Sequence, residues 1–293
     1  MIRPSPKYLW TVAGLLVALV IAAWGASQAI FRSDAILAAR HPLPPSAIVA
    51  ATTPEAIARG ERLVVVTNCT GCHGVDLTGG PLRVAGTPVF TANLTRVTAR
   101  RTDAELDRAI RHGLRPNGSS ELAMPSTAYS AFTDDEMASI IGYLRSLPPK
   151  GVNLPKFEPG LFLRASLLTG GLKMEADQVA SAKPPLDAGP GVAAGRHLAA
   201  IACGRCHGSD LGGTRDAGPD MTVRGYYSRA QFFSLVKQGE MIGEGNMQLM
   251  TQTAKASFSH FTDGEIEAIY AYLDARDRIL IAQAAKVAQA RKP

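Results

Sequence analysis

The chain has 293 residues, of which 46% are hydrophobic and 19% are charged, and its formal net charge is +6. This length suits two compact units of about 100 residues each better than one small domain. Basic and acidic residues almost balance in residues 50–150 and again in 187–293. A nucleic-acid-binding protein concentrates its Lys and Arg on one segment or face, so we exclude nucleic acid as a partner.

The chain opens with an uncharged apolar segment at residues 8–31, YLWTVAGLLVALVIAAWGASQAIF. About 20 apolar residues span a bilayer as a helix, so we predict a transmembrane anchor here. Arg3 and Lys7 precede it, which places residues 1–7 in the cytoplasm and the remainder of the chain outside it. A cleaved signal peptide is the alternative, because residues 27–29 resemble a cleavage site, but the apolar run is longer than the usual signal.

After a Pro- and Ala-rich stalk at residues 32–53, the sequence repeats itself. The first copy opens PEAIARGERLVVVTNCTGCHG at Pro54, and the second opens PGVAAGRHLAAIACGRCHG at Pro190. Both copies run from Pro through an apolar helical stretch with an internal Gly to a Cys-x-x-Cys-His-Gly motif. The chain therefore contains two units of one fold, which we place at residues 54–148 and 187–275.

The two copies also end alike, with FTDDEMASIIGYL up to Leu144 and FTDGEIEAIYAYL up to Leu273. Thr133 and Thr262 are followed three residues later by Glu, which is the spacing of a capping box at a helix start. Apolar residues then recur at helical spacing. No stretch alternates with the period of a strand, so we predict an all-α fold, with further short helices at 103–111 and 228–237.

Two segments lie outside the repeats. Residues 149–186 link the units and contain the apolar stretch GLFLRASLLTGGL, which we expect either to pack against one domain or to dip toward the membrane surface. Residues 276–293 form an Ala-rich tail with a basic end, which we predict to be helical.

The two Cys-x-x-Cys-His motifs carry the chemistry. Two thiols about one helical turn apart can add to the two vinyl groups of one haem, and the adjacent imidazole then lies under the iron. The motifs predict two covalent haem c groups, attached through cysteines and bound at iron by histidines: Cys69, Cys72, His73, Cys203, Cys206 and His207. Covalent attachment also indicates a compartment outside the bacterial cytoplasm.

Two other interpretations of the cysteines are weaker. A single four-cysteine zinc site would have to join pairs that lie in separate repeated units. A thioredoxin-type redox pair would need strands around it, and the sequence gives no sign of them.

The sixth iron ligand of the first copy is predicted to be Met124, which precedes Pro125 and the capping box. A Met thioether opposite His gives a low-spin iron and raises its reduction potential. Met137 also lies in this copy, but it falls on the apolar stripe of the last helix and suits core packing. His112 is the other alternative, although it stands at a helix end typical of a surface residue.

The second copy leaves more alternatives open, because four methionines follow its motif: Met221, Met241, Met247 and Met250. Aligning the last helices without a gap places Thr253 at the ligand position, and Thr is a poor iron ligand. A three-residue insertion places Met250 there instead, and we predict Met250. Met247, His260 and an open position remain as alternatives.

The second ring nitrogen of an iron-binding His usually donates to a carbonyl or another acceptor. Pro-containing segments at residues 86–88 and 218–220 follow the two motifs at similar distances. They are candidates for that acceptor, and ordinary turns are the alternative interpretation.

Both units resemble class I cytochrome c domains, with an N-terminal helix containing Gly, the Cys-x-x-Cys-His motif, a Pro-containing loop, a Met ligand and a C-terminal helix ending in Tyr-Leu. The TANLT stretch at 91–95 and the run from Met124 to the helix end are similar to cytochrome domains in subunits of membrane-bound alcohol and aldehyde dehydrogenases. Those subunits typically carry three haem domains, whereas this chain has two. The resemblance implies a role in electron transfer.

The sequence thus favours an electron-transfer protein that is not itself an enzyme. We expect a dihaem cytochrome c held in the bacterial inner membrane by its N-terminal helix, with both haem domains in the periplasm. It would relay electrons from a donor such as a dehydrogenase to the respiratory chain, with a terminal oxidase or another cytochrome as acceptor. The alternative is a dihaem oxidoreductase, a peroxidase or a sulfur-compound oxidase, with an open or unusual site at the second haem. A haem-based sensor or assembly subunit is a third class, and the short cytoplasmic end carries no signalling segment.

Overall fold

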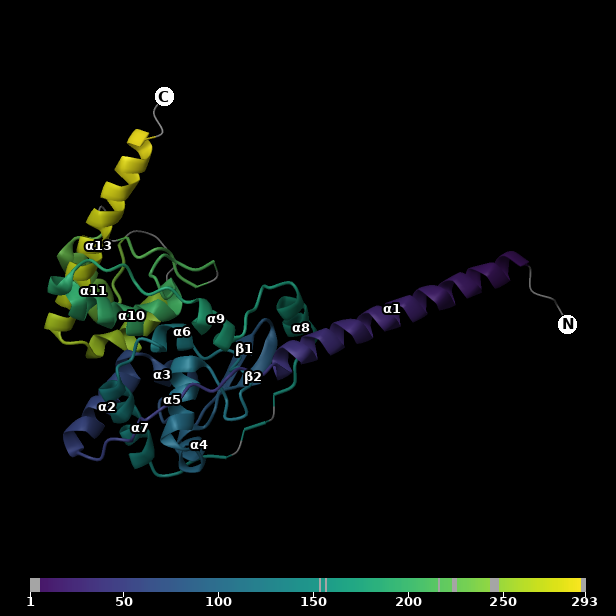
Figure 1. The fold of residues 1–293 in the computed structure, drawn as a ribbon, viewed down its shortest axis with the longest axis horizontal. Helices are drawn as coiled ribbons and strands as arrows, with labels where there is room; N and C mark the ends of the chain where they lie inside the picture. The colour runs from purple at the N-terminus through teal and green to yellow at the C-terminus, as the bar shows by residue number, and fades with distance from the viewer. Residues whose placement is uncertain are drawn as a thin grey trace.

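The structure, a computed structural model, describes residues 6–152, 154–155, 157–215, 217–222, 226–242 and 248–290. Two helical units lie side by side, and one long helix projects from each of them (Figure 1). The chain is 61% helix and 4% strand, which confirms the all-α prediction.

The first long helix, α1 (Pro6–Ala38), continues beyond the predicted span into residues 32–38. Residues 10–27 are exposed on every side. Within the described part of the chain, α1 alone is long and apolar enough to cross a membrane, with a mean hydropathy of 1.9. Length and composition therefore agree with an anchor.

The predicted stalk is bound to the first unit rather than free. The amide of His41 donates to the carbonyl of Gly118 at 2.8 Å, and the amide of Ala51 donates to that of Ala138 at 2.9 Å. The amide of Ala50 donates to the Asp103 carboxylate at 2.7 Å. Residues 39–53 thus cross the first unit as an extended strap.

The first unit begins and ends with two long helices that cross, α2 (Pro54–Val66) and α7 (Asp134–Ser146). The capping box predicted at Thr133 is present, with Glu136 as its partner. Between the two helices the chain forms, in order, α3 (Cys69–His73), β1 (Pro81–Val84), β2 (Thr87–Phe90), α4 (Leu94–Val97), a 3-10 turn (Thr98–Arg100), α5 (Asp103–His112) and α6 (Ser126–Tyr129).

The hairpin of β1 and β2 was not predicted. Its strands pair Pro81 with Phe90 and Val84 with Thr87, and its turn has positive φ at Ala85 and Gly86. Two residues of positive φ make the turn that suits a two-residue hairpin. Strands of four residues are too short for a period of two to stand out in the sequence.

The second unit repeats the plan. Helix α10 (Ala193–His207), which follows a 3-10 turn (Pro190–Val192), crosses α13 (Asp263–Ala290). The elements between them are α11 (Arg229–Gln238), α12 (Gln248–Ala256) and a 3-10 turn, η3 (Phe258–His260). Helix α13 runs on without a break through most of the predicted tail, and residues 291–293 lie outside the described residues.

The linker forms two helices that pack on α1 and on the first unit. Helix α8 (Leu161–Leu168) lies against α1, and α9 (Glu175–Ser181) lies against α5 and α6. Leu163 and Leu167 of α8 are buried with Met174 in a small apolar cluster. Part of the apolar linker therefore packs on the protein, which was one of the two predicted alternatives.

Each unit contributes one side chain to the hydrophobic core of the other, and the two residues stand at equivalent positions of the repeat. Val66, at the end of α2, belongs to the core of the second unit, and Ile201, at the matching position of α10, belongs to the core of the first. Two charged pairs also join the first helix of one unit to the last helix of the other. Arg62 contacts Glu265, and His197 contacts Glu136 at 2.8 Å. The units are thus joined as a near-symmetric pair.

In both units the first and last helices touch backbone to backbone at a glycine. A Cβ at Gly60 would lie 2.0 Å from the carbonyl oxygen of Ser139, and one at Gly195 would lie 1.9 Å from that of Ala268. No side chain fits at either position, so both glycines are required by the crossing.

We expect Gly195→Ala to lower the free energy of unfolding by about 1–3 kcal/mol, because the methyl group overpacks a rigid backbone contact. Gly264→Ala is the control, since a Cβ there meets nothing within 4 Å. Urea unfolding of the haem-loaded protein, followed in the Soret band and by circular dichroism, measures both variants. Equal stability of the two variants would contradict the close crossing.

Candidate haem sites

Each Cys-x-x-Cys-His motif lies where the first helix of its unit ends. In the second unit the motif is the last turn of α10. In the first unit, α2 stops at Val66, Asn68 takes a left-handed conformation with φ 60°, and the motif forms the separate helix α3. The first copy has one more residue than the second between its internal Gly and the motif, and the break at Asn68 accommodates it.

A cavity in the first unit brings the predicted residues together. Its wall includes Cys69, Cys72 and His73 from α3 and Met124 from the loop before α6. Most of the remaining lining is apolar, with side chains from the hairpin, α5 and α7. Met137 is fully buried in the core and His112 is not part of the cavity wall, which leaves Met124 as the candidate ligand.

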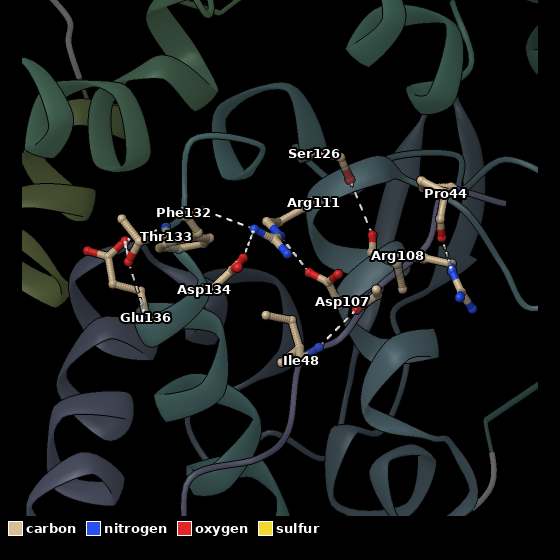
Figure 2. A network of polar contacts seen from close by, with 12 residues as sticks. Pro44, Ile48, Asp107, Arg108, Arg111, Ser126, Phe132, Thr133, Asp134 and Glu136 are labelled. Carbon is tan, nitrogen blue, oxygen red and sulfur yellow. Dashed lines mark hydrogen bonds and ion pairs between the residues drawn. The ribbon is translucent and has the colours of Figure 1, made fainter.

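The Met124 loop is supported by a polar network on α5. The Ser126 hydroxyl donates to the carbonyl of Ala109 at 3.3 Å. Figure 2 shows Arg111 between two carboxylates, Asp107 at 2.5 Å and Asp134 at 2.7 Å, which ties α5 to the start of α7. The residue that follows the loop is thereby joined to α5, which is itself tied to α7.

Helix α9 covers the other side of this region. The amide of Ala176 donates to the Ser120 hydroxyl at 2.9 Å. Glu175 is buried, and this burial raises the pKa of its carboxyl to about 8, although an amide hydrogen bond from Ser126 opposes the shift. The linker therefore contributes to the surroundings of the first site.

The second unit has the corresponding cavity, lined by Cys203, Cys206, His207, Met221 and Met250 among others. Met221 follows Pro219, which contacts the His207 ring, and so enters the cavity from the histidine side. Met250 belongs to α12, an element separate from the loop that contacts His207, and it stays the predicted ligand. Met241 and His260 are not part of the cavity wall, and Met247 lies outside the described residues.

Both histidines are oriented by a backbone carbonyl. His73 Nδ1 lies 2.8 Å from the carbonyl oxygen of Ala92, and His207 Nδ1 lies 2.7 Å from that of Pro219. The predicted acceptor segment was right in the second copy and wrong in the first, where residues 86–88 belong to the hairpin. Donation from Nδ1 leaves Nε2 free to bind iron.

Burial lowers the pKa of His73 and His207, although the hydrogen bond to the carbonyl opposes this in both. The neutral imidazole is the form that binds a metal. The cysteines form no disulfide. Each cavity thus offers two thiols, a neutral imidazole, a thioether and an apolar lining, and these groups fit haem c. The two cysteine pairs line separate cavities, which disfavours a single four-cysteine zinc site.

Sequence comparison matches each unit to a cytochrome family. Residues 57–148 match the family described as cytochrome c, and residues 190–273 match cytochrome c oxidase, cbb3-type, subunit III. The chain is a dihaem class I cytochrome c. It therefore carries two covalently bound haem c groups and transfers electrons.

Its relatives include cytochrome subunits of larger enzymes. The cytochrome subunit of fructose dehydrogenase from Gluconobacter japonicus is 26% identical over 74% of this chain and 52% of its own length. The cytochrome c subunit of the quinone alcohol dehydrogenase from Komagataeibacter europaeus is 32% identical over 32% of this chain and 23% of its own. Subunit CcoP of the cbb3-type oxidase of Helicobacter pylori (strain 52) is 32% identical over 36% of this chain and 32% of its own length. The chain thus spans about half or less of these relatives.

Arg205, which sequence reasoning missed, connects the two haem sites of this dihaem cytochrome. It stands inside the second Cys-x-x-Cys-His motif, yet it lines the cavity of the first unit. Its guanidinium donates to the carbonyl of Asn68 at 3.3 Å. Next to it, a Cβ at Gly204 would lie 3.3 Å from the Cβ of Ala128, just after the Met124 loop. A local motif carries no information on such a contact between units.

We expect Met250→Ala to remove the thioether ligand of the second haem only, because Met250 belongs to that cavity alone. The second iron then becomes high-spin and its reduction potential falls. Met221→Ala, in the same cavity, is the control and keeps the low-spin spectrum. Magnetic circular dichroism and a redox titration measure both. A low-spin spectrum unchanged in Met250→Ala would rule out this ligand.

We expect Arg205→Gln to lower the reduction potential of the first haem, because a nearby positive charge stabilises the ferrous over the ferric state by about 1 kcal/mol. Lys286→Gln removes the same charge from the exposed end of α13 and is the control. A spectroelectrochemical titration of the two variants measures the difference. Equal potentials in both variants would contradict the role of Arg205.

Proposed function

We propose that this cytochrome is a membrane-anchored periplasmic carrier that passes electrons from a dehydrogenase to the respiratory chain. The observation that carries this proposal is that each cavity holds a His together with a Met that could bind the same iron: His73 with Met124 in the first, and His207 with Met250, beside Met221, in the second. If the His and the Met of each cavity both bound the iron, no position on the iron would remain for a substrate. When bound, haem supplies reversible one-electron redox chemistry.

The residues of the chain then have distinct tasks. The cysteines of each motif, Cys69 with Cys72 and Cys203 with Cys206, fix the porphyrin by thioether bonds. The histidine ring is held by its carbonyl partner and would bind the iron, and a methionine thioether bound to the same iron would raise its potential. The apolar lining keeps water away from the iron.

The contact between the units supports transfer within the chain. The second haem motif lies directly on the first unit through Gly204 and Arg205. This contact would place the two haem groups in adjoining packed regions of the protein.

Location and partners follow from α1 and from the relatives. Helix α1 suits a single span of the bacterial inner membrane, and Lys7 before it favours a cytoplasmic N-terminus. Relatives named as cytochrome subunits of fructose and alcohol dehydrogenases support a dehydrogenase as donor. The relative from a cbb3-type oxidase supports a terminal oxidase or another cytochrome as acceptor.

The alternative is a dihaem peroxidase or sulfur-compound oxidoreductase, which needs an open iron at the second haem. The position of Met250 in that cavity argues against it.

The test uses the tagged full chain purified from membranes in mild detergent. We expect both ferric haems to be low-spin in electron paramagnetic resonance, and a dehydrogenase to copurify whose substrate reduces both haems under anaerobic conditions. A high-spin ferric haem that binds cyanide or consumes peroxide would overturn the carrier in favour of the enzyme. Recovery of the chain in the soluble fraction would overturn the anchor alone.

A further inference from the structure

Helix α8 exposes two large apolar side chains beside the end of α1. Leu161 and Phe162 are each 79% exposed, whereas Leu163 is fully buried and Leu167 is 6% exposed. The helix therefore buries one side in the protein and presents large hydrophobic groups on the other. Two adjacent large apolar side chains exposed beside a helix long and apolar enough to cross a membrane suit contact with an apolar partner.

The position of α8 along α1 is fixed by polar contacts. Arg164 forms an ion pair with Asp34 at 2.7 Å and donates to the Ser33 hydroxyl at 2.6 Å. The same guanidinium donates to the carbonyl of Ile30 at 3.3 Å. Leu163 packs with residues near the end of α1 in one apolar cluster. The two helices therefore form one rigid corner.

That corner lies where α1 would leave the bilayer. A helix of about 20 residues spans the hydrocarbon core, so a span that starts at Trp10 ends near Ile30. The first residues of α1 that the protein partly covers are Gln28 and Ala29, and the first charged residue after the span is Arg32. Residues 161 and 162 precede Arg164 by less than one helical turn, which is about 5 Å.

The hairpin of the first unit supports the exposed side chains. A Cβ at Gly86, in the hairpin turn, would lie 3.7 Å from that of Phe162. A Cβ at Gly160, just before α8, would lie 2.8 Å from the hydroxyl of Thr87 in the same hairpin. Arg83 of β1 donates to the carbonyl of Gly86 at 3.2 Å, so a cation that suits lipid phosphates stands at the edge of this apolar group.

We propose that Leu161, Phe162 and the hairpin turn at Gly86 insert into the lipid interface beside α1 and hold the first unit on the bilayer surface. This inference rests on the proposed anchoring by α1, with which the surface is continuous. In Figure 1, α1 joins the molecule beside α8 and the hairpin, away from α11 and α13. The first haem then lies closer to the membrane than the second.

The test places the haem-loaded full chain in nanodiscs that contain a phosphatidylcholine with a diazirine on its acyl chain. After illumination, mass spectrometry maps the lipid adducts. We expect adducts on α1 and on the peptide that contains Leu161 and Phe162, and none at Val75, which is 93% exposed on the same unit. Adducts on α1 alone would overturn the proposal. A lack of adducts on α1 as well would overturn the anchoring on which it rests.

A second measurement uses single cysteines. The four natural cysteines all belong to the haem motifs, so a new thiol is the one reactive site of the haem-loaded chain. We expect Phe162→Cys in nanodiscs to react about tenfold slower with a charged maleimide than Val75→Cys, because lipid excludes the reagent and disfavours the thiolate. Both should react alike in denaturant. Equal rates in nanodiscs would overturn the proposal, as would slow labelling without lipid adducts, since a protein surface would then cover Phe162.

Discussion

The close crossing of the first and last helices is the constraint on which each unit depends. At Gly60 and at Gly195 a helix touches the backbone of its partner so closely that no side chain fits between them. The first helix leads directly into the cysteines and histidine, and the last helix follows the segment that carries the methionine. The crossing therefore sets the distance between the two sides of the cavity. A glycine outside the cavity lining therefore influences the spacing of the residues that would hold one haem.

The same helices also join the two units. Val66 and Ile201 each complete the core of the opposite unit, and the charged pairs involve the Glu of each capping box. Burial raises the pKa of Glu136, but the hydrogen bonds from His197 and from the amide of Thr133 outweigh it and keep that pKa low. A residue that starts a helix in one unit thus also binds the other unit. Neither core is complete alone, so the two haem sites are held at a fixed separation.

Features that depend on residues close together in the sequence could be predicted. Features that depend on contacts between distant segments could not. The haem motifs and the capping boxes follow from short-range spacing, so they could be predicted, whereas the internal glycines were noted without the helix crossing that requires them. Met250 needed an inferred insertion, and its neighbour Met247 lies outside the described residues. The carbonyl of Ala92 could not be found, because the hairpin before it displaces the acceptor by several residues. The strap of residues 39–53 carries no periodic pattern, since its backbone bonds to another segment.

The repeat departs from symmetry at the point where the two sites meet. The position of Arg205 in the second motif is occupied in the first by Gly71, where a Cβ would lie 2.2 Å from the Asn68 side-chain oxygen. A Cβ at Gly71 would require the Asn68 side chain to move, and the carbonyl of Asn68 accepts the guanidinium of Arg205. Two arginines at matching positions near a two-fold axis would repel each other, whereas one arginine against a carbonyl is stabilising. The single charge of Arg205, which interacts with Cys72 of the first motif and with Cys206 of its own, therefore lies where the two motifs meet.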